Sequence, residues 1–305
     1  MLFKTIDDVK LYIKVNGTVD IRNLEPFGND AQEKYLRPFL GATLFTELTT
    51  YTYDNEAVPE WNSITPEDVK NYLEQLLPFA KNALAKFIFV LSSPITDLQI
   101  TDGGFQVIMN QNMAPASAER VKKFTEGLEV QGYDCIETML RFLEAKVDQY
   151  PSWKSSEAYT RELRNFINSA EEFNKYVNIG SSRLTFLRWR NTIDNVEILQ
   201  VDPVISPDLA SKIRLQIQEK EVSDANKKIL PYLCRAVANF AASVELQDPK
   251  FERLGEHYLG EARKIMDASV DDYPEYKAST AYSTTRTSYA PYENSSDTGF
   301  FVFGG

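Results

Sequence analysis

Residues 65–91, TPEDVKNYLEQLLPFAKNALAKFIFVL, decide the fold class of this chain. They open with a threonine able to cap a helix, a proline at the first helical position and two acids near the positive end of the helix dipole. From Leu73 to Leu91 apolar residues recur three and four positions apart, which is the period of one buried helical face. Pro78 falls inside this pattern, and because proline removes a backbone donor we expect a kink or a break there.

The same helical period returns in three further regions, and strands are scarce. We expect helices from about Ser117 to Val147, from Ser206 through Val244, and after Pro249. Between the first two lies LQITDGGFQVI, residues 98–108, in which two alternating runs flank an Asp-Gly-Gly turn. This pattern predicts a small β-hairpin at about residues 97–108. The fold class is therefore mainly α, a helical bundle with one hairpin.

A chain of 305 residues with 43% hydrophobic content has room for two domains or one duplicated domain. Residues 33–45, EKYLRPFLGATLF, resemble residues 174–186, NKYVNIGSSRLTF, and residues 77–87, LPFAKNALAKF, resemble residues 230–240, LPYLCRAVANF. A duplication with this register requires an insertion in the second half. The alternative is that two unrelated amphipathic helices share a composition, so both interpretations stay open.

These patterns divide the chain into a first helical unit with the hairpin (1–150), a second helical unit (151–272) and an extended C-terminal tail (273–305), with a linker at Pro151–Ser156. The tail is rich in Tyr, Ser and Thr and keeps no helical period, so alone it cannot bury enough apolar surface to fold. Its alternating aromatic residues suit the clasping of a neighbouring subunit, and the alternative is a tail that folds back on its own domain. The predicted partner-binding residues of hairpin and tail are Phe105, Val107, Tyr289, Tyr292, Phe300, Phe301 and Phe303.

Composition argues against several classes of function. The net charge of −11 leaves no basic surface overall for nucleic-acid phosphates. The N-terminus predicts a short amphipathic helix and no signal peptide, and the apolar stretch at 83–91 is shorter than the roughly 20 residues of a membrane span. We expect Cys135 and Cys234 to be buried thiols and His257 to lie on a helix surface, which leaves no ordinary zinc site.

Catalytic motifs are missing from the sequence. There is no phosphate-cradling glycine loop, no dinucleotide fingerprint and no nucleophile elbow. The adjacent acidic pairs are interpreted as caps and surface charge, because neighbouring residues on a helix do not face one another. We therefore expect no enzyme, no catalytic residue, no metal and no cofactor.

Residues 183–190, RLTFLRWR, interleave basic and aromatic side chains. Such a cluster can stack on and neutralise nucleic acid. The favoured interpretation is a core-facing helix with Arg183 and Arg190 at its solvent border, forming a basic rim that pairs with an acidic subunit.

Several of these pieces resemble known proteins. Residues 33–45, the hairpin arm Gly104–Ile108 leading to the helix at Ser117, and residues 132–143, GYDCIETMLRFL, resemble an uncharacterised family of Bacteroidetes phages and prophages. That resemblance spans most of residues 1–270. The helical unit containing LPFAKNAL, residues 77–84, is also similar to head-to-tail connector (adaptor) proteins of tailed phages. Adaptors are shorter single units, so a duplicated chain departs from their pattern.

The resemblance implies a structural virion protein, made in the host cytoplasm, that forms a homo-oligomeric ring at the head–tail junction. Its partners would be copies of itself and a portal or tail protein, with no sequence-specific nucleic acid and no membrane. The acidic balance suits a channel through which DNA slides without adsorbing. Two other classes remain as alternatives: a cytoplasmic helical scaffold that captures a peptide between its two halves, and an enzyme of unknown type.

Overall fold

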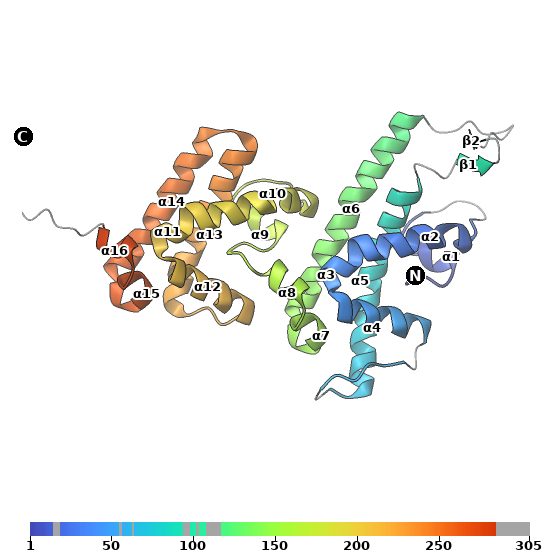
Figure 1. Ribbon diagram of the computed structural model, residues 1–305, viewed down its shortest axis with the longest axis horizontal. Helices are drawn as coiled ribbons and strands as arrows, with labels where there is room; N and C mark the ends of the chain where they lie inside the picture. Colours follow the sequence, from blue (N-terminus) through green and yellow to red (C-terminus); the bar gives the residue numbers. More distant parts are fainter. Residues whose placement is uncertain are drawn as a thin grey trace, which may run out of the picture.

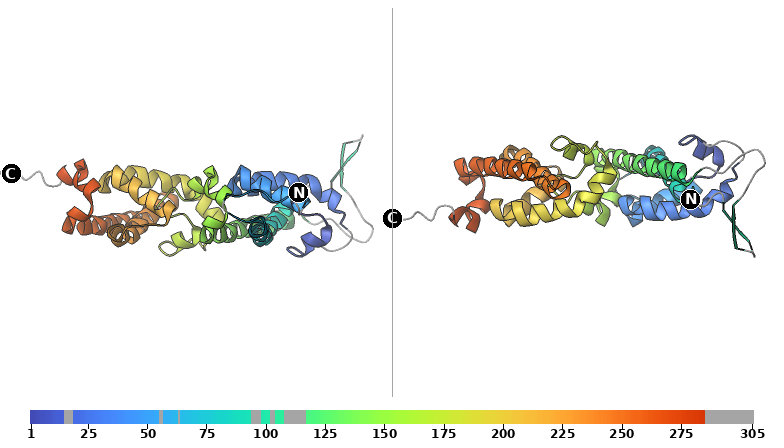
Figure 2. Two further views of the ribbon diagram at one scale, coloured as in Figure 1. Left: turned by 90° about the horizontal axis from the view of Figure 1, so that it is seen from below. Right: turned by 90° about the horizontal axis from the view of Figure 1, so that it is seen from above.

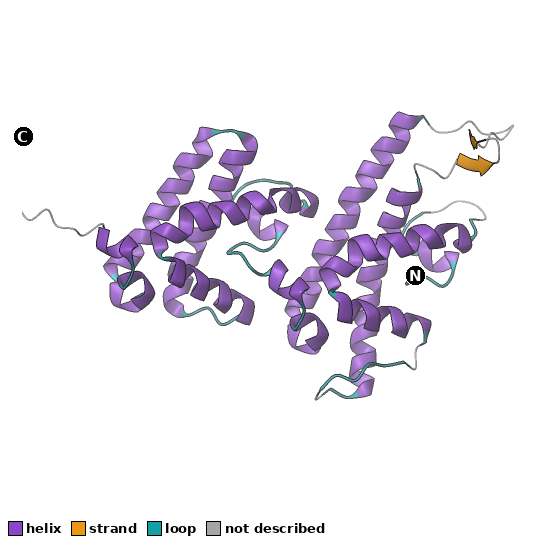
Figure 3. Cartoon of the chain, in the orientation of Figure 1, coloured by secondary structure: helices purple, strands orange, loops and turns teal. Residues whose placement is uncertain are grey.

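A computed structural model describes residues 1–14, 19–54, 57–62, 64–93, 98–101, 104–107 and 117–284. Helices make up most of this part of the chain, which confirms a mainly α, bundled fold (Figure 3). Two short strands, β1 (Leu98–Thr101) and β2 (Gly104–Val107), pair antiparallel with Ile100 opposite Phe105.

The helices form two units that follow one another along the long axis of the molecule (Figures 1 and 2). Unit 1, residues 1–163, contains α1 (Ile6–Lys10), α2 (Ile21–Ala31), the π-helix η1 (Gln32–Leu36), α3 (Arg37–Leu40), α4 (Ala42–Tyr53), α5 (Pro66–Ser92), α6 (Ala118–Ala145), η2 (Val147–Gln149), α7 (Pro151–Lys154) and α8 (Glu157–Glu162).

Unit 2, residues 166–284, contains α9 (Ala170–Asn174), α10 (Arg183–Val196), the π-helix η3 (Glu197–Val201), α11 (Asp202–Ile205), α12 (Pro207–Glu219), α13 (Asp224–Leu246), α14 (Pro249–Ala268), η4 (Val270–Asp272), α15 (Pro274–Lys277) and α16 (Thr280–Thr284).

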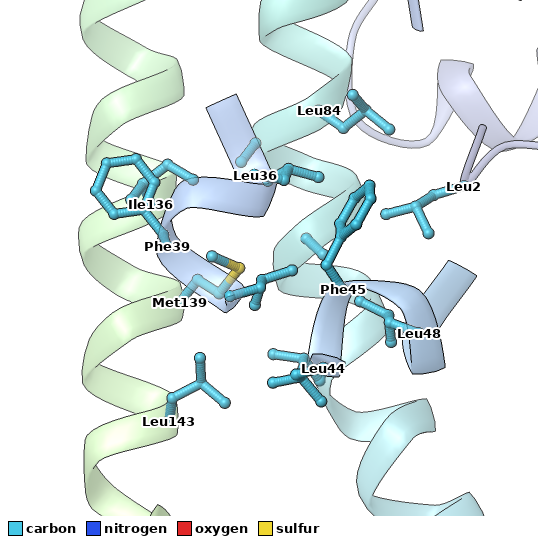
Figure 4. Packing of buried hydrophobic residues seen from close by; sticks show 14 of the residues in the cluster. Leu2, Leu36, Phe39, Leu44, Phe45, Leu48, Leu84, Ile136, Met139 and Leu143 are labelled. Atoms are coloured by element: carbon cyan, nitrogen blue, oxygen red, sulfur yellow. The ribbon is translucent and has the colours of Figure 1, made fainter. Parts of the chain in front are cut away.

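Each unit has its own hydrophobic core. The first runs from Met1 to Leu163 and is centred on the antiparallel pair α5 and α6, over which α2 to α4 pack (Figure 4). The second runs from Phe166 to Tyr276 and is centred on α13 and α14. Within the described residues, α13 alone is long and apolar enough to cross a membrane, yet 56% of that stretch is buried in the protein, as expected of a core helix.

Two predicted boundaries are wrong. Pro151–Ser156 is no linker, because α7 inserts Trp153 into the first core and the Trp153 indole donates to the Phe39 carbonyl at 2.9 Å. The tail does not begin at 273, because Tyr273 and Tyr276 are buried in the second core and α15 and α16 continue the unit to Thr284. The predicted break at Pro78 is also absent: α5 is one helix of 27 residues, with Leu76 and Ala80 buried on either side of the proline.

The two units repeat the same order of elements, and Figure 1 shows them in similar orientations. In each, a π-helix leads to a short helix and then to a residue with positive φ, Gly41 at +76° and Ser206 at +86°. Residues 147–154, VDQYPSWK, and 270–277, VDDYPEYK, adopt the same turn, and each contains a Lys–Asp ion pair of 2.7 Å.

Finer contacts repeat as well. The hydroxyls of Tyr150 and Tyr273 each donate to the main-chain carbonyl six residues before the internal proline of α5 or α13, at 2.7 and 2.8 Å. Eighteen residues before each tyrosine is a glycine, Gly132 or Gly255, against which a phenylalanine ring of the partner helix packs. These pairs give a residue-by-residue correspondence between the units.

That correspondence corrects the predicted register. Residues 77–87 and 230–240 are equivalent, but residues 33–45 match 198–210, because both stretches run from the π-helix through the positive-φ residue into the next helix. Residues 174–186 instead hold the end of α9, a loop and the start of α10. Two connections are longer in unit 1: the one between α4 and α5, and the one between α5 and α6 that contains the hairpin. The different spacing of the two halves therefore does not come from an insertion in the second half.

Candidate functional site

The partner-binding residues predicted from the sequence fall mostly outside the described residues. Phe105 and Val107 lie on β2, at the opposite end of the molecule from α16 (Figure 2). Tyr289, Tyr292, Phe300, Phe301 and Phe303 lie beyond residue 284, outside the described residues. Their role in binding stays a prediction.

The basic and aromatic segment 183–190 has a different place from the one predicted. Arg183 does not lie at a solvent border: it is 1% exposed and sits at the junction between the two units. Its guanidinium binds Glu137 of α6 at 2.9 Å and Glu162 at the end of α8. Arg190, about two turns further along the same face of α10, binds Glu162 at 2.6 Å. The predicted basic rim therefore pairs with acids of the same chain and not with an acidic subunit.

These four residues form what we call the junction cluster: Glu137 and Glu162 from unit 1, Arg183 and Arg190 from unit 2. The charges of these four residues cancel, as burial requires. Arg161, whose side chain is 42% exposed, adds a third arginine beside Glu162 at 3.3 Å. Burial alone would raise the pKa of Glu162, but the hydrogen bond from Arg190 and the charges of Arg183 and Arg190 lower it to about 2. The carboxylate is thus charged at neutral pH and holds both arginines.

Main-chain hydrogen bonds tie the cluster to the start of unit 2. The carboxylate of Glu137 accepts from the backbone N–H of Ala170 at 2.9 Å, at the first turn of α9. Arg183 also donates to the carbonyl of Asn168 at 3.3 Å, and the Arg183 guanidinium lies 5.3 Å from the Phe186 ring centre. A shift of one unit against the other would break several of these bonds together, so the cluster sets the register of the junction.

A cleft of about 760 Å³ opens beside the cluster, between α6, α9 and the end of α12. Arg141 and Glu171 cross it with an ion pair of 2.6 Å, and Lys175 and Lys220 line it from unit 2. Burial raises the pKa of Glu144 in its wall to about 7, and Glu137 adds to the rise while Arg183 and Lys220 oppose it. The cleft therefore combines mixed charge with a titratable acid near neutral pH.

The stacked rings of Phe79 and Phe142, 4.6 Å between centres, form the apolar part of this cleft. The cleft lacks a cluster of catalytic type. Nowhere in the described ranges do three His, Cys, Asp or Glu side chains gather in a way that could hold a metal. His257 is exposed on α14, Cys234 is buried and Cys135 is half-buried.

One exposed apolar surface distinguishes unit 2 from unit 1. Ile198 and Leu199, on η3, are 59% and 71% exposed. The matching residues of η1 are Glu33 and Lys34, both exposed and charged, with Glu33 paired to Arg37 at 2.7 Å. Since the same fold tolerates charges here, the aliphatic pair is not needed for folding of the unit.

Comparison with known protein families matches part of the chain. The family of unknown function DUF6712 matches residues 36–162, a part of unit 1 from the end of η1 to the end of α8. No curated protein matches the chain. No solved structure matches it either.

Proposed function

We propose that this chain is a structural virion protein, a head-to-tail connector or adaptor ring component that acts through protein–protein assembly and not as an enzyme. The observation that carries the proposal is the head-to-tail arrangement of two like units in one chain (Figure 1). Such an arrangement leaves two unlike open ends. Repeated head-to-tail contacts close into a ring when the rotation between neighbours permits it.

The two ends carry different additions, which supports the proposal. The hairpin β1–β2 extends from the end formed by unit 1, and the chain leaves α16 at the end formed by unit 2 (Figure 2). The proposed clasps between neighbours are Phe105 and Val107 of the hairpin and the aromatic residues of the C-terminal tail, which lie outside the described residues. We attribute the repetition of the units to a duplication of an adaptor-like helical unit.

The proposed partners are copies of this chain and another virion protein such as a portal or tail protein. The exposed pair Ile198 and Leu199, present in unit 2 and replaced by charges in unit 1, is the candidate contact for that unlike partner. The net charge of −11 fits a ring through which DNA passes without being held. The protein would be made in the host cytoplasm, would end in the virion and would need no cofactor, metal or membrane.

Light scattering on the purified chain tests the proposal, with electron microscopy of any assembly. A shortened chain must keep α15 and α16, so it should end at Thr284, because an end at Asp272 would remove the buried Tyr273 and Tyr276. We expect rings from the full chain, alone or with a portal-like protein encoded nearby, and weaker assembly from the shortened chain. Monomers in every mixture would contradict a connector.

A scaffold that captures a peptide between its two halves is the alternative, and the 760 Å³ cleft at the junction is the observation that favours it. It requires a monomer that binds a peptide in this cleft. Selection from a peptide library, repeated on a Phe142→Asp variant, would decide: selected peptides that bind the monomer and lose affinity for the variant support the scaffold. Arg188→Asp, an exposed change on α10, is the matched control.

A further inference from the structure

The junction between unit 1 and unit 2 has counterparts at the two open ends of the molecule. Unit 1 gives the junction one face of α6 and α8, and unit 2 gives it α9 and α10. By the repeat, the matching elements left open are α14 and α16 at the end formed by unit 2, and α1 and α2 at the end formed by unit 1. Figure 1 shows the helices of the two units in similar orientations.

The helices α1 and α9 correspond closely. Thr5 caps α1 and Ser169 caps α9 by accepting from the backbone N–H three residues on, at 3.2 and 3.1 Å. Six residues after each cap the backbone has the same conformation, with φ −65° and ψ −25° at Leu11 and φ −65° and ψ −24° at Lys175. Positions on the two helices can therefore be compared one by one.

The two residues that form the ion pair across the internal junction have counterparts of the same charge at the open ends. Inside the chain, Arg141, nine residues before Tyr150, binds Glu171, two residues after the α9 cap, at 2.6 Å. Nine residues before Tyr273 is Lys264, and two residues after the α1 cap is Asp7. Their side chains are 74% and 84% exposed, and the ion pairs that they form within the described part of the chain are local ones on the same helix, with Glu261 and Lys10.

The apolar lining of the cleft also has counterparts. Lys175 shares the internal cleft with Phe79 and Phe142. The residues at these positions on the open ends are Leu11, Tyr232 and Ile265. Leu11 is 78% exposed, the highest value among the exposed large apolar residues of the described chain, and Tyr232 and Ile265 are half-buried. An apolar side chain thus replaces the lysine opposite an apolar wall.

The junction cluster itself is not repeated. Glu137 corresponds to Gly260, beside which the structure leaves open space, and Arg183 corresponds to Thr18, which lies outside the described residues. A small neutral residue takes the place of Glu137, and Arg190 corresponds to Glu25, whose side chain is exposed. Separation of the open ends therefore leaves neither of these positions with a buried, uncompensated charge. This is what a reversible contact between chains requires.

We propose that copies of this chain associate head to tail through a repeat of the internal junction, with Lys264 of one copy against Asp7 of the next and Leu11 of the next copy against Tyr232 and Ile265. This interface rests on the proposed function and identifies the surface that would build the ring. The conserved charge pair supplies the register, and the apolar contact supplies most of the binding.

Charge reversal in the full chain tests the interface. Lys264→Glu places two acids opposite one another, and Asp7→Lys places two lysines opposite one another, so each variant alone should associate about three- to tenfold more weakly than the wild type. An equimolar mixture of the two variants restores opposite charges at every contact and should associate like the wild type. Leu11→Asp should weaken association both in the otherwise wild-type chain and in the equimolar mixture of the two reversal variants.

Lys227→Glu is the matched control, because Lys227 is an exposed lysine of α13 and its counterpart Glu74 bonds inside unit 1 to Tyr51 at 2.8 Å. Sedimentation velocity over a concentration series gives the readout. Recovery in the mixture supports the interface. Association of the wild type that neither reversal changes would overturn this interface and leave the ring proposal standing, whereas a monomeric wild type at every concentration, alone and with a portal-like protein, would overturn both.

Discussion

Replacing Arg183 by methionine should destabilise the protein more than any surface change. The side chain is 1% exposed and compensates two buried carboxylates, those of Glu137 and Glu162. Removing one partner of a buried ion pair costs about 3–5 kcal/mol, because the other charge stays buried without compensation. Arg190 remains beside Glu162 and limits the loss, so we expect about 3 kcal/mol.

Urea unfolding followed by circular dichroism at pH 7 measures this loss, read separately for each transition if the two units unfold apart. Arg188→Met, an exposed change on the same helix, should stay within about 0.5 kcal/mol of the wild type. The quadruple variant Arg183→Met, Arg190→Met, Glu137→Gln, Glu162→Met should recover most of the loss, since it removes all four charges of the junction cluster and keeps an acceptor for the Ala170 N–H. A loss below about 1 kcal/mol for the single variant would refute the assignment of a buried, mutually compensated cluster.

The pH dependence gives a second reading of the same cluster. The pKa of Glu162 is lowered to about 2 from an ordinary value of 4.5. A lowered pKa means that the stabilisation is present above pH 4.5 and is lost as the pH falls towards 2. The difference corresponds to roughly 3 kcal/mol at full effect. In the quadruple variant this part of the loss of stability at acid pH should disappear. The same loss between pH 4.5 and pH 2 in the variant as in the wild type would contradict the role of Glu162.

Three further predictions concern single positions. Gly132→Ala should lower the free energy of unfolding in urea by about 1–3 kcal/mol, because the new Cβ would lie 2.7 Å from an aromatic ring of α5. Gly127→Ala, in open space on the same helix, should raise the free energy of unfolding by up to about 1 kcal/mol. Glu144→Gln should raise the free energy of unfolding by up to about 3 kcal/mol at pH 8 and by almost nothing at pH 4.5. The reason is that a pKa raised to about 7 makes the ionised carboxylate costly in the folded protein only at higher pH. Equal changes in the free energy of unfolding at both pH values would contradict this explanation. Ser206→Gly should raise the melting temperature, since a φ of +86° is strained for a residue with a side chain. Gly41→Ala, at the equivalent place in unit 1, should lower the melting temperature. Changes in melting temperature of the same sign for both variants would contradict the shared backbone conformation.

The long helices could be predicted from the sequence because their signals are local. The helices that begin at Pro66, Pro207 and Pro249 each combine a first-turn proline with a sustained apolar period. Short helices gave no such signal. The polar composition around Tyr273 and Pro274 favours a tail. The stretches VDQYPSWK at 147–154 and VDDYPEYK at 270–277 nevertheless contain a repeat that indicates α15.

The junction cluster could not be predicted, for a physical reason. Arg183 is 46 residues from Glu137 and 21 from Glu162, and no periodic pattern connects positions on different units. Within its own helix, Arg183 has the sequence context of a border residue, and this favoured the wrong placement. Burial of an arginine depends on where two carboxylates lie in space, which follows only once both cores have formed.

The contrast between the internal junction and the open ends has a consequence for any ring. Buried charges suit a junction whose two sides are always joined by the chain, because they set the register and are never exposed by dissociation. The open ends carry instead the exposed charges of Lys264 and Asp7 and the exposed Leu11, which solvent tolerates when copies are apart. Since every chain brings two units, a closed head-to-tail ring must contain an even number of units and half that number of chains. Native mass spectrometry of an intact ring, set against the count of α5–α6 and α13–α14 hairpins in averaged images, would test this: an odd number of hairpins would exclude a ring made of this chain alone by head-to-tail contacts.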